Sequence, residues 1–97
     1  MRLKDKVAII TGGSQGIGRE YALRFAREGA KIAIGDIREA QAQEVAEEIA
    51  KLGSESLALR TDVSKEEDTK RLAAATHEKF GRIDILLNNA EIGRAHV

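Results

Sequence analysis

The sequence VAIITGGSQGIG, residues 7–18, joins an apolar segment to a glycine-rich loop and then to an amphipathic helix that ends near Gly29. Glycine has no Cβ atom, so a loop with several glycines turns sharply and lets main-chain N–H groups approach a phosphate closely. The helix that follows adds its unpaired first-turn N–H groups and the positive end of its dipole, both directed at a diphosphate. The stretch therefore predicts a nucleotide-binding site.

Apolar segments and helical periods alternate along the rest of the chain. We predict strands at 7–10, 31–35, 56–61 and 83–87, and helices that end near residue 29 and that span 38–52 and 64–81. This alternation is typical of βαβ units, and a strand of four consecutive apolar residues fits a parallel sheet buried on both faces. The sequence thus predicts an α/β fold of Rossmann type, with strand order 3-2-1-4 and helices on both faces.

Two of the helices carry local signals. In the first helix one stripe is apolar, and we expect it to face the sheet; it consists of Ile17, Tyr21, Ala22, Phe25 and Ala26. In the third helix, Ser64 and Glu67 have the spacing of a capping box, in which each side chain bonds the main-chain N–H of the other residue. We therefore predict that this helix begins at Ser64.

The composition describes one small globular domain. Of its 97 residues, 42% are hydrophobic and 33% are charged, and 16 basic residues balance 16 acidic ones. Because neither sign forms a long run, we expect no nucleic-acid partner and no membrane partner. The absence of cysteine excludes thiolate metal sites, and no apolar run approaches the ~18 residues of a membrane span. We expect a cytoplasmic protein without a metal site.

An acidic residue follows the second predicted strand. Asp36 lies 18 positions beyond Gly18, where the nucleotide-binding fold places a carboxylate that accepts hydrogen bonds from the ribose hydroxyls of the adenosine. Its charge would repel a 2′-phosphate, and Ser14 and Gln15 add no cation to the loop, so the sequence favours NAD. Arg38 could receive a 2′-phosphate, which leaves NADP as the alternative.

These residues and two later motifs resemble the N-terminal half of a short-chain dehydrogenase/reductase. The family pattern TGxxxGxG matches residues 11–18, the ribose carboxylate matches Asp36, an Asp-Val pair matches residues 62–63, and the motif NNAG matches residues 88–90. The resemblance implies an NAD(P)-dependent oxidoreductase that interconverts a hydroxyl and a carbonyl by hydride transfer. It also implies that the sheet is truncated after its fourth strand. The cofactor-binding residues that we predict are Gly12, Ser14, Gln15, Gly16, Ile17, Gly18, Asp36, Asp62, Val63, Asn89 and Ala90.

The resemblance also implies a role for each part of this set. Asp62 lies by the adenine ring with the Val63 main chain beside it, and residues 14–17 contact the ribose and the diphosphate. Asn89 and Ala90 flank the cofactor and steady the central strand. The parent enzyme would act on a small alcohol or carbonyl compound and would be a homo-oligomer.

The chain lacks the catalytic residues of the family, which are a serine and a Tyr-x-x-x-Lys pair. Its single tyrosine is Tyr21, and the residue four positions later is Phe25. A phenol without a neighbouring cation keeps a pKa near ~10 and exchanges protons poorly at neutral pH. We therefore assign no catalytic residue and predict that the chain itself is inactive.

The ending departs from the family pattern, because Glu91 stands where NNAG has its glycine. One set of codons for residues 91–97 and a stop matches, after its first base, the start of a widely used sequencing adapter. We hypothesise that residues 1–90 are the N-terminal part of an NAD(P)-binding Rossmann domain and that residues 91–97 are a non-native tail of translated adapter. A nucleotide record with other codons for residues 92–97 would refute this.

Two other functions remain open from the sequence. One is a non-catalytic nucleotide-binding module. The other is an S-adenosylmethionine-dependent methyltransferase, which also places a glycine loop after its first strand and an acid after its second. Its loop usually reads GxGxG, which the TGGSQGIG of residues 11–18 does not match.

Overall fold

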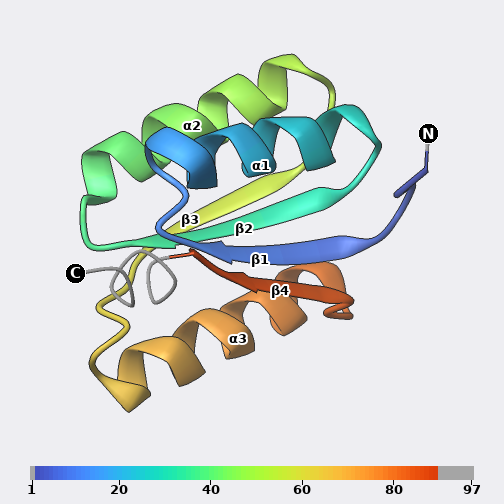
Figure 1. Ribbon diagram of the computed structural model, residues 1–97. Helices are drawn as coiled ribbons and strands as arrows, with labels where there is room; N and C mark the ends of the chain where they lie inside the picture. Colours follow the sequence, from blue (N-terminus) through green and yellow to red (C-terminus); the bar gives the residue numbers. More distant parts are fainter. Residues whose placement is uncertain (1, 90–97) are drawn as a thin grey trace.

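The computed structural model describes residues 2–89, which form three layers with a parallel sheet in the middle (Figure 1). The sheet has the strand order β3-β2-β1-β4, and all three strand pairings are parallel. In chain order the elements are β1 (Val7–Thr11), α1 (Gly16–Arg27), β2 (Lys31–Asp36), α2 (Glu39–Lys51), β3 (Ser56–Arg60), α3 (Glu66–Phe80) and β4 (Ile85–Asn88). The predicted fold class and strand order are confirmed.

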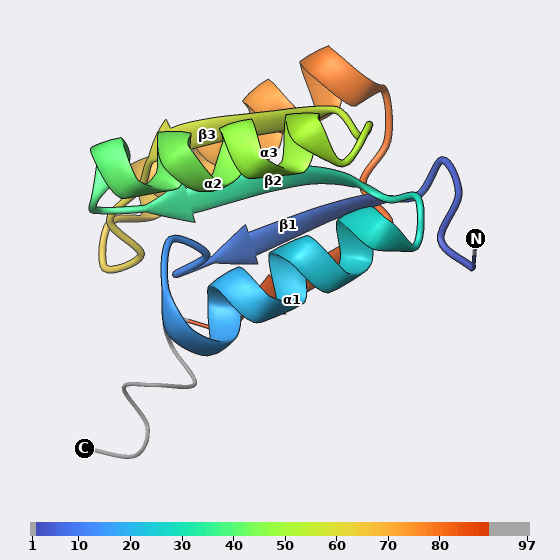
Figure 2. The same ribbon diagram turned by 90° about the horizontal axis from the view of Figure 1, so that it is seen from above.

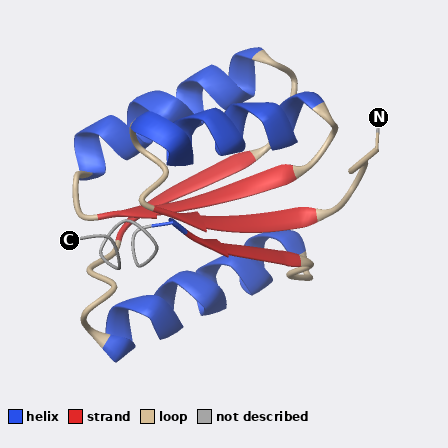
Figure 3. Ribbon diagram, viewed as in Figure 1, coloured by secondary structure: helices blue, strands red, loops and turns tan. Residues whose placement is uncertain are grey.

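Helices cover both faces of the sheet. Figures 1 and 2 show α1 and α2 on one face and α3 on the other. Alternate residues of β1 serve the two layers: Ile10 packs in the core beneath α1 and α2, whereas Ile9 packs with Leu72 of α3. Every residue of β1 is buried, as expected for a central strand of a parallel sheet. The secondary-structure colouring in Figure 3 shows that the loops after β1, β2 and β3 all lie at the same end of the sheet.

The inward face of α1 agrees with the prediction only in part. Ile17 is 67% exposed and Tyr21 is 39% exposed, whereas Ala22, Leu23 and Ala26 are buried. Ala22 and Ala26 are thus buried as predicted and Phe25 packs against the core, whereas the prediction is wrong for Ile17 and Tyr21. Tyr21 instead packs against Phe25, with ring centroids 6.0 Å apart.

The predicted capping box is wrong. The helix α3 begins at Glu66 with Lys65 as its N-cap residue. The hydroxyl and the main-chain N–H of Ser64 both donate to Asp62 Oδ1, at 2.6 and 2.9 Å. A short acidic side chain two residues upstream offers the serine a local turn, and this turn competes with the cap.

Ala90 and the predicted tail at residues 91–97 lie outside the described residues. Within residues 2–89, none of the helices has the length and the apolar character needed to traverse a membrane. The described part of the chain also contains no cluster of three or more side chains suited to binding a metal ion.

Candidate functional site

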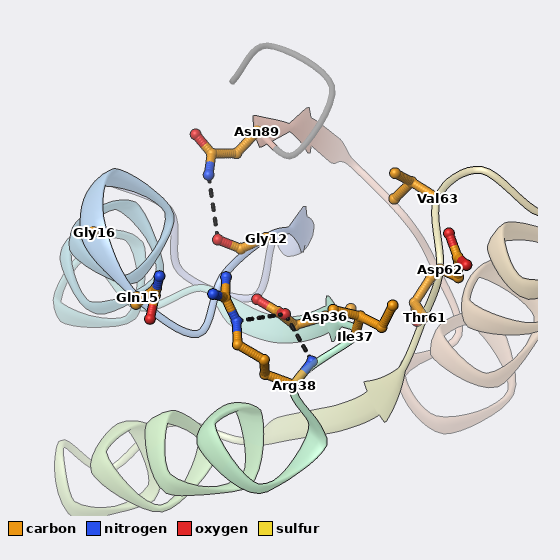
Figure 4. Close-up of a pocket in the computed structure, with 11 residues that line it drawn as sticks. Gly12, Gln15, Gly16, Asp36, Ile37, Arg38, Thr61, Asp62, Val63 and Asn89 are labelled. Carbon is orange, nitrogen blue, oxygen red and sulfur yellow. Dashed lines mark hydrogen bonds and ion pairs between the residues drawn. The ribbon is translucent and has the colours of Figure 1, made fainter. Parts of the chain in front are cut away.

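A cavity of about 390 Å³ opens at the carboxyl ends of β1, β2 and β3. Figure 4 shows the glycine loop on one side of it and the loop after β3 on the other. In open parallel sheets, ligands bind at this edge, outside the carboxyl ends of the strands. The cavity is lined by Gly12, Gln15, Gly16, Gly35, Asp36, Ile37, Arg38, Thr61, Asp62, Val63 and Asn89.

The glycines of the loop are required by its geometry. Gly12 and Gly16 have φ angles of 66° and 59°, in the left-handed region that disfavours other residues. At Gly18, a Cβ atom would lie 2.0 Å from the main-chain oxygen of Gly12. Only glycine at this position lets the first turn of α1 pack directly against the end of β1.

The N-terminus of α1 lies at the cavity. Among the described residues, the side chain of its N-cap residue, Gln15, makes no capping hydrogen bond to the first turn. A helix leaves its first N–H groups without intrahelical acceptors and carries a partial positive charge there. Nothing lies within 4 Å of the position where a Cβ atom of Gly16 would be built. The open space beside this helix end can therefore admit an anionic group such as a diphosphate.

Two asparagines fix the loop from the side of β4. The Thr11 hydroxyl donates to Asn88 Oδ1 at 2.8 Å, and Asn89 Nδ2 donates to the main-chain oxygen of Gly12 at 3.2 Å. Figure 4 shows the second of these bonds crossing from β4 to the loop. Asn89 thus holds the glycine loop against the sheet and also lines the cavity.

Asp36 is the centre of the hydrogen-bond network at the cavity, although it is only 4% exposed. Its Oδ2 accepts the hydroxyl of Ser14 at 2.6 Å and the main-chain N–H of Ser14 at 3.1 Å. Ser14 is itself buried, so both bonds are shielded from water. The carboxylate therefore anchors the glycine loop in addition to lining the cavity.

The second oxygen of Asp36 faces Arg38. Oδ1 accepts the Arg38 main-chain N–H at 2.9 Å and lies 3.4 Å from Arg38 Nε (Figure 4). Burial alone would raise the pKa of Asp36, but hydrogen bonds from Ser14 and Arg38, together with the Arg38 charge, hold this pKa below its usual value. Asp36 is therefore an anion at neutral pH with a cation beside it.

Asp62 and Val63 occupy the loop after β3. The two hydrogen bonds from Ser64 lower the pKa of Asp62, so this carboxyl is also ionised at neutral pH. Val63 lines the cavity, and among residues 2–89 its main-chain N–H has no acceptor. An aromatic nitrogen of a bound base is one acceptor that could satisfy this donor.

The structure brings most of the predicted site residues together. Those that line the cavity are Gly12, Gln15, Gly16, Asp36, Asp62, Val63 and Asn89. Ser14 and Gly18 are buried and shape the loop from behind, Ile17 is exposed on α1, and Ala90 is outside the described residues.

Three lining residues were not predicted: Gly35, Ile37 and Thr61. Gly35 had a detectable signal, since it interrupts an otherwise apolar strand. A Cβ atom there would lie 2.5 Å from Leu72 Cδ2 and 2.9 Å from Thr61 Oγ1. Glycine at this position lets α3 and the end of β3 approach the floor of the site.

The donor set of the cavity fits the adenosine diphosphate part of a dinucleotide. It combines an open helix N-terminus for phosphates, a carboxylate suited to ribose hydroxyls, and an available N–H in the loop after β3. Comparison with known proteins agrees with this chemistry. A model of the short chain dehydrogenase family matches residues 6–97. The chain belongs to this family.

The similar proteins are longer than this short-chain dehydrogenase sequence, which matches only part of each. The 7alpha-hydroxysteroid dehydrogenase of Escherichia coli (strain K12) is 43% identical over 90 residues, which are 93% of this chain and 35% of the relative. A crystal structure of hydroxysteroid dehydrogenase from Escherichia coli matches with a TM-score of 0.87 and 42% identity, over 90% of this chain and 37% of that one.

A third match carries a nucleotide. The 3-ketoacyl-(acyl-carrier-protein) reductase from Brucella melitensis, solved as a complex with NADH, has a TM-score of 0.80 and 45% identity, over 87% of this chain and 33% of that one. The short-chain dehydrogenase sequence therefore spans about a third of the length of these relatives.

Proposed function

We propose that the chain is the part of an NAD(P)-dependent oxidoreductase that binds the adenosine and diphosphate of the cofactor. The observation that carries the proposal is the cavity itself. It places the uncapped N-terminus of α1 and the buried carboxylate of Asp36 on the same opening at the carboxyl edge of the sheet. Phosphate and ribose are neighbours in a dinucleotide, and these two groups suit them.

Each cofactor-binding residue then has a distinct part. Main-chain N–H groups at residues 15–18 would receive the diphosphate, and the loop conformation that presents them depends on Gly12, Gly16 and Gly18. Asp36 would accept the ribose hydroxyls, and Asp62 with Val63 would border the adenine. Asn89 and Ala90 would flank the cofactor next to the central strand. The bound nicotinamide cofactor would supply or accept the hydride.

The preference between NAD and NADP depends on Asp36 and Arg38. The Asp36 carboxylate is ionised and buried, and an ionised carboxylate at this position repels a 2′-phosphate. The Arg38 side chain is 48% exposed and already interacts with Asp36 Oδ1, so part of its charge is neutralised there. We therefore infer that NAD is preferred and that Arg38 permits weaker binding of NADP.

Hydride transfer between an alcohol and a carbonyl belongs, in this proposal, to a longer parent protein. The chain spans only about a third of its relatives, and its sequence has no Tyr-x-x-x-Lys pair. A small alcohol or carbonyl compound would be the substrate, and the parent would be a homo-oligomer. The family match supports this interpretation over a methyltransferase or a non-catalytic module.

Equilibrium binding tests the proposal. NADH is titrated with the 97-residue chain while nicotinamide fluorescence and anisotropy are followed, and ADP-ribose or S-adenosylmethionine is then added as a competitor. We expect saturable NADH binding that ADP-ribose displaces and S-adenosylmethionine does not, with no turnover of added alcohols. Displacement by S-adenosylmethionine alone, or no NADH binding at millimolar concentration, would refute it.

A further inference from the structure

A buried carboxylate outside the cavity holds the loop after β3. Asp68, in the first turn of α3, is 6% exposed and does not line the cavity. Its Oδ2 accepts the main-chain N–H of Asp62 at 2.9 Å. The capping box would have bonded Glu67 to the main-chain N–H of Ser64. In the structure the next residue, Asp68, is bonded to the main-chain N–H of Asp62.

Asp68 is in turn fixed from its other side. Arg71 Nη2 lies 3.3 Å from Asp68 Oδ1 and donates to the main-chain oxygen of Arg60, the last residue of β3, at 3.4 Å. A carboxylate in the first turn of a helix also interacts favourably with the helix dipole. The Asp62 main chain is therefore tied to α3 through Asp68, and through Asp68 and Arg71 to the end of β3.

Counting acceptors among residues 2–89 alone, this network leaves one main-chain N–H of the loop without an acceptor. Among residues 2–89, every N–H from residue 61 to 65 except that of Val63 has one: Thr61 donates to the Asp36 main-chain oxygen, Asp62 to Asp68, Ser64 to the Asp62 carboxylate and Lys65 to the Asp62 main-chain oxygen. Val63 lines the cavity and also a second, mostly apolar pocket, whose other lining residues include Ile9, Leu72 and Leu86.

We propose that Asp68 is a positioning residue for the base of the bound nucleotide. Through its bond to the Asp62 N–H it fixes the peptide that precedes Val63, so that the Val63 N–H is presented to an acceptor nitrogen of a purine. This inference rests on the proposed function, since it assigns the base to the Asp62–Val63 side of the cavity. It requires an acceptor oxygen at residue 68, not a negative charge.

Three variants of the full chain separate these requirements. Asp68→Ala removes the acceptor, Asp68→Asn retains an acceptor oxygen of the same reach without the charge, and Glu67→Ala removes a neighbouring charge in the same turn. The Glu67 side chain is exposed and makes no hydrogen bond or ion pair with the described residues, so it is a matched control. Calorimetry measures the affinity for ADP-ribose, which has a base, and for inorganic pyrophosphate, which has none.

We expect Asp68→Ala to weaken ADP-ribose binding at least tenfold, and Asp68→Asn and Glu67→Ala to change it less than threefold. Pyrophosphate affinity should be equal in all four proteins. Equal ADP-ribose affinity in Asp68→Ala and wild type, or equal losses in Asp68→Ala and Asp68→Asn, would overturn the inference. So would a parallel loss of pyrophosphate affinity, which would indicate general disruption of the fold.

A failure of the proposed function has a different signature, because wild type would then bind neither ligand. Amide hydrogen exchange provides a second measurement if Asp68→Ala does not fold. The Asp62 N–H should exchange at least tenfold more slowly than the Val63 N–H in wild type, and ADP-ribose should slow the exchange at Val63. Equal exchange at the two amides, or no effect of ADP-ribose at Val63, would contradict the assignment.

Discussion

Removing the Ser14 hydroxyl tests whether Asp36 anchors the glycine loop. The Ser14 hydroxyl donates to Asp36 Oδ2 at 2.6 Å, and both residues are nearly inaccessible to water. A hydrogen bond to a buried charged group contributes about 1.5–3 kcal/mol, and the Ser14 main-chain N–H would keep the same oxygen partly satisfied after the substitution. We therefore expect Ser14→Ala to lower the free energy of unfolding by about 2 kcal/mol.

The chain contains its own control for this experiment. The hydroxyl of Ser64 donates to Asp62 Oδ1 at the same 2.6 Å, but Ser64 is exposed. Ser64→Ala should therefore change the unfolding free energy by less than about 0.5 kcal/mol. With a urea m-value of about 1 kcal/mol/M, the midpoint should fall by about 2 M for Ser14→Ala and stay nearly unchanged for Ser64→Ala.

Urea unfolding followed by circular dichroism measures both variants under the same conditions. The two serine–carboxylate hydrogen bonds have equal length and equal chemistry, so the variants should differ in stability only because Ser14 is buried and Ser64 is exposed. Equal midpoints for the two variants would refute it, as would a Ser14→Ala protein as stable as wild type. In either case the buried bond at Asp36 would not be what holds the loop.

Three further predictions address the site. Gly18→Ala should weaken ADP-ribose binding at least tenfold by calorimetry, because the Gly12 oxygen would have to move by about 1.4 Å to reach ordinary contact with the new Cβ atom. Gly53→Ala is the control: it is strained by the φ of 89° but lies away from the cavity, so the affinity for ADP-ribose should not change. Arg38→Ala should raise the ratio of the Kd for 2′-phospho-ADP-ribose to that for ADP-ribose at least fivefold, and an unchanged ratio would exclude Arg38 from this selection. Because the pKa of Asp36 is lowered in the folded chain, ionised Asp36 should contribute its full stabilisation above the unfolded carboxyl pKa of about 3.9, and this stabilisation should be lost as the pH falls through the folded pKa. In urea titrations, the unfolding free energy of Asp36→Asn should lack this loss at low pH.

The elements whose physics is local could be predicted from the sequence. The apolar segment Val7–Thr11 is buried on both faces, and the predicted bounds of the second helix differ from those of α2 by one residue at each end. The glycine loop was recognisable because Gly12 and Gly16 adopt left-handed conformations and Gly18 contacts the Gly12 main chain, three requirements that other residues do not meet. The strand order was predicted from the Rossmann fold that the glycine loop indicates, since alternating strands and helices alone allow other orders.

The contacts between separate segments could not be predicted in the same way. Tyr21 was expected against the sheet because helical periodicity does not show which of two adjacent stripes packs closest. The turn that Ser64 makes with Asp62 competes with the capping box for the same serine side chain, and the sequence contains the residues for both. Asp36 was predicted as a ribose ligand, but its bonds to Ser14, across 22 positions, required the folded sheet.

The most direct test of the account is a two-dimensional ¹H–¹⁵N NMR titration of the chain with ADP-ribose. We expect saturable shifts of the amides at Gly12–Gly18, at Asp36–Arg38 and at Val63, with the C-terminal half of α3 unchanged. Saturable binding whose shifts map elsewhere would contradict it, and so would an absence of shifts at millimolar ligand.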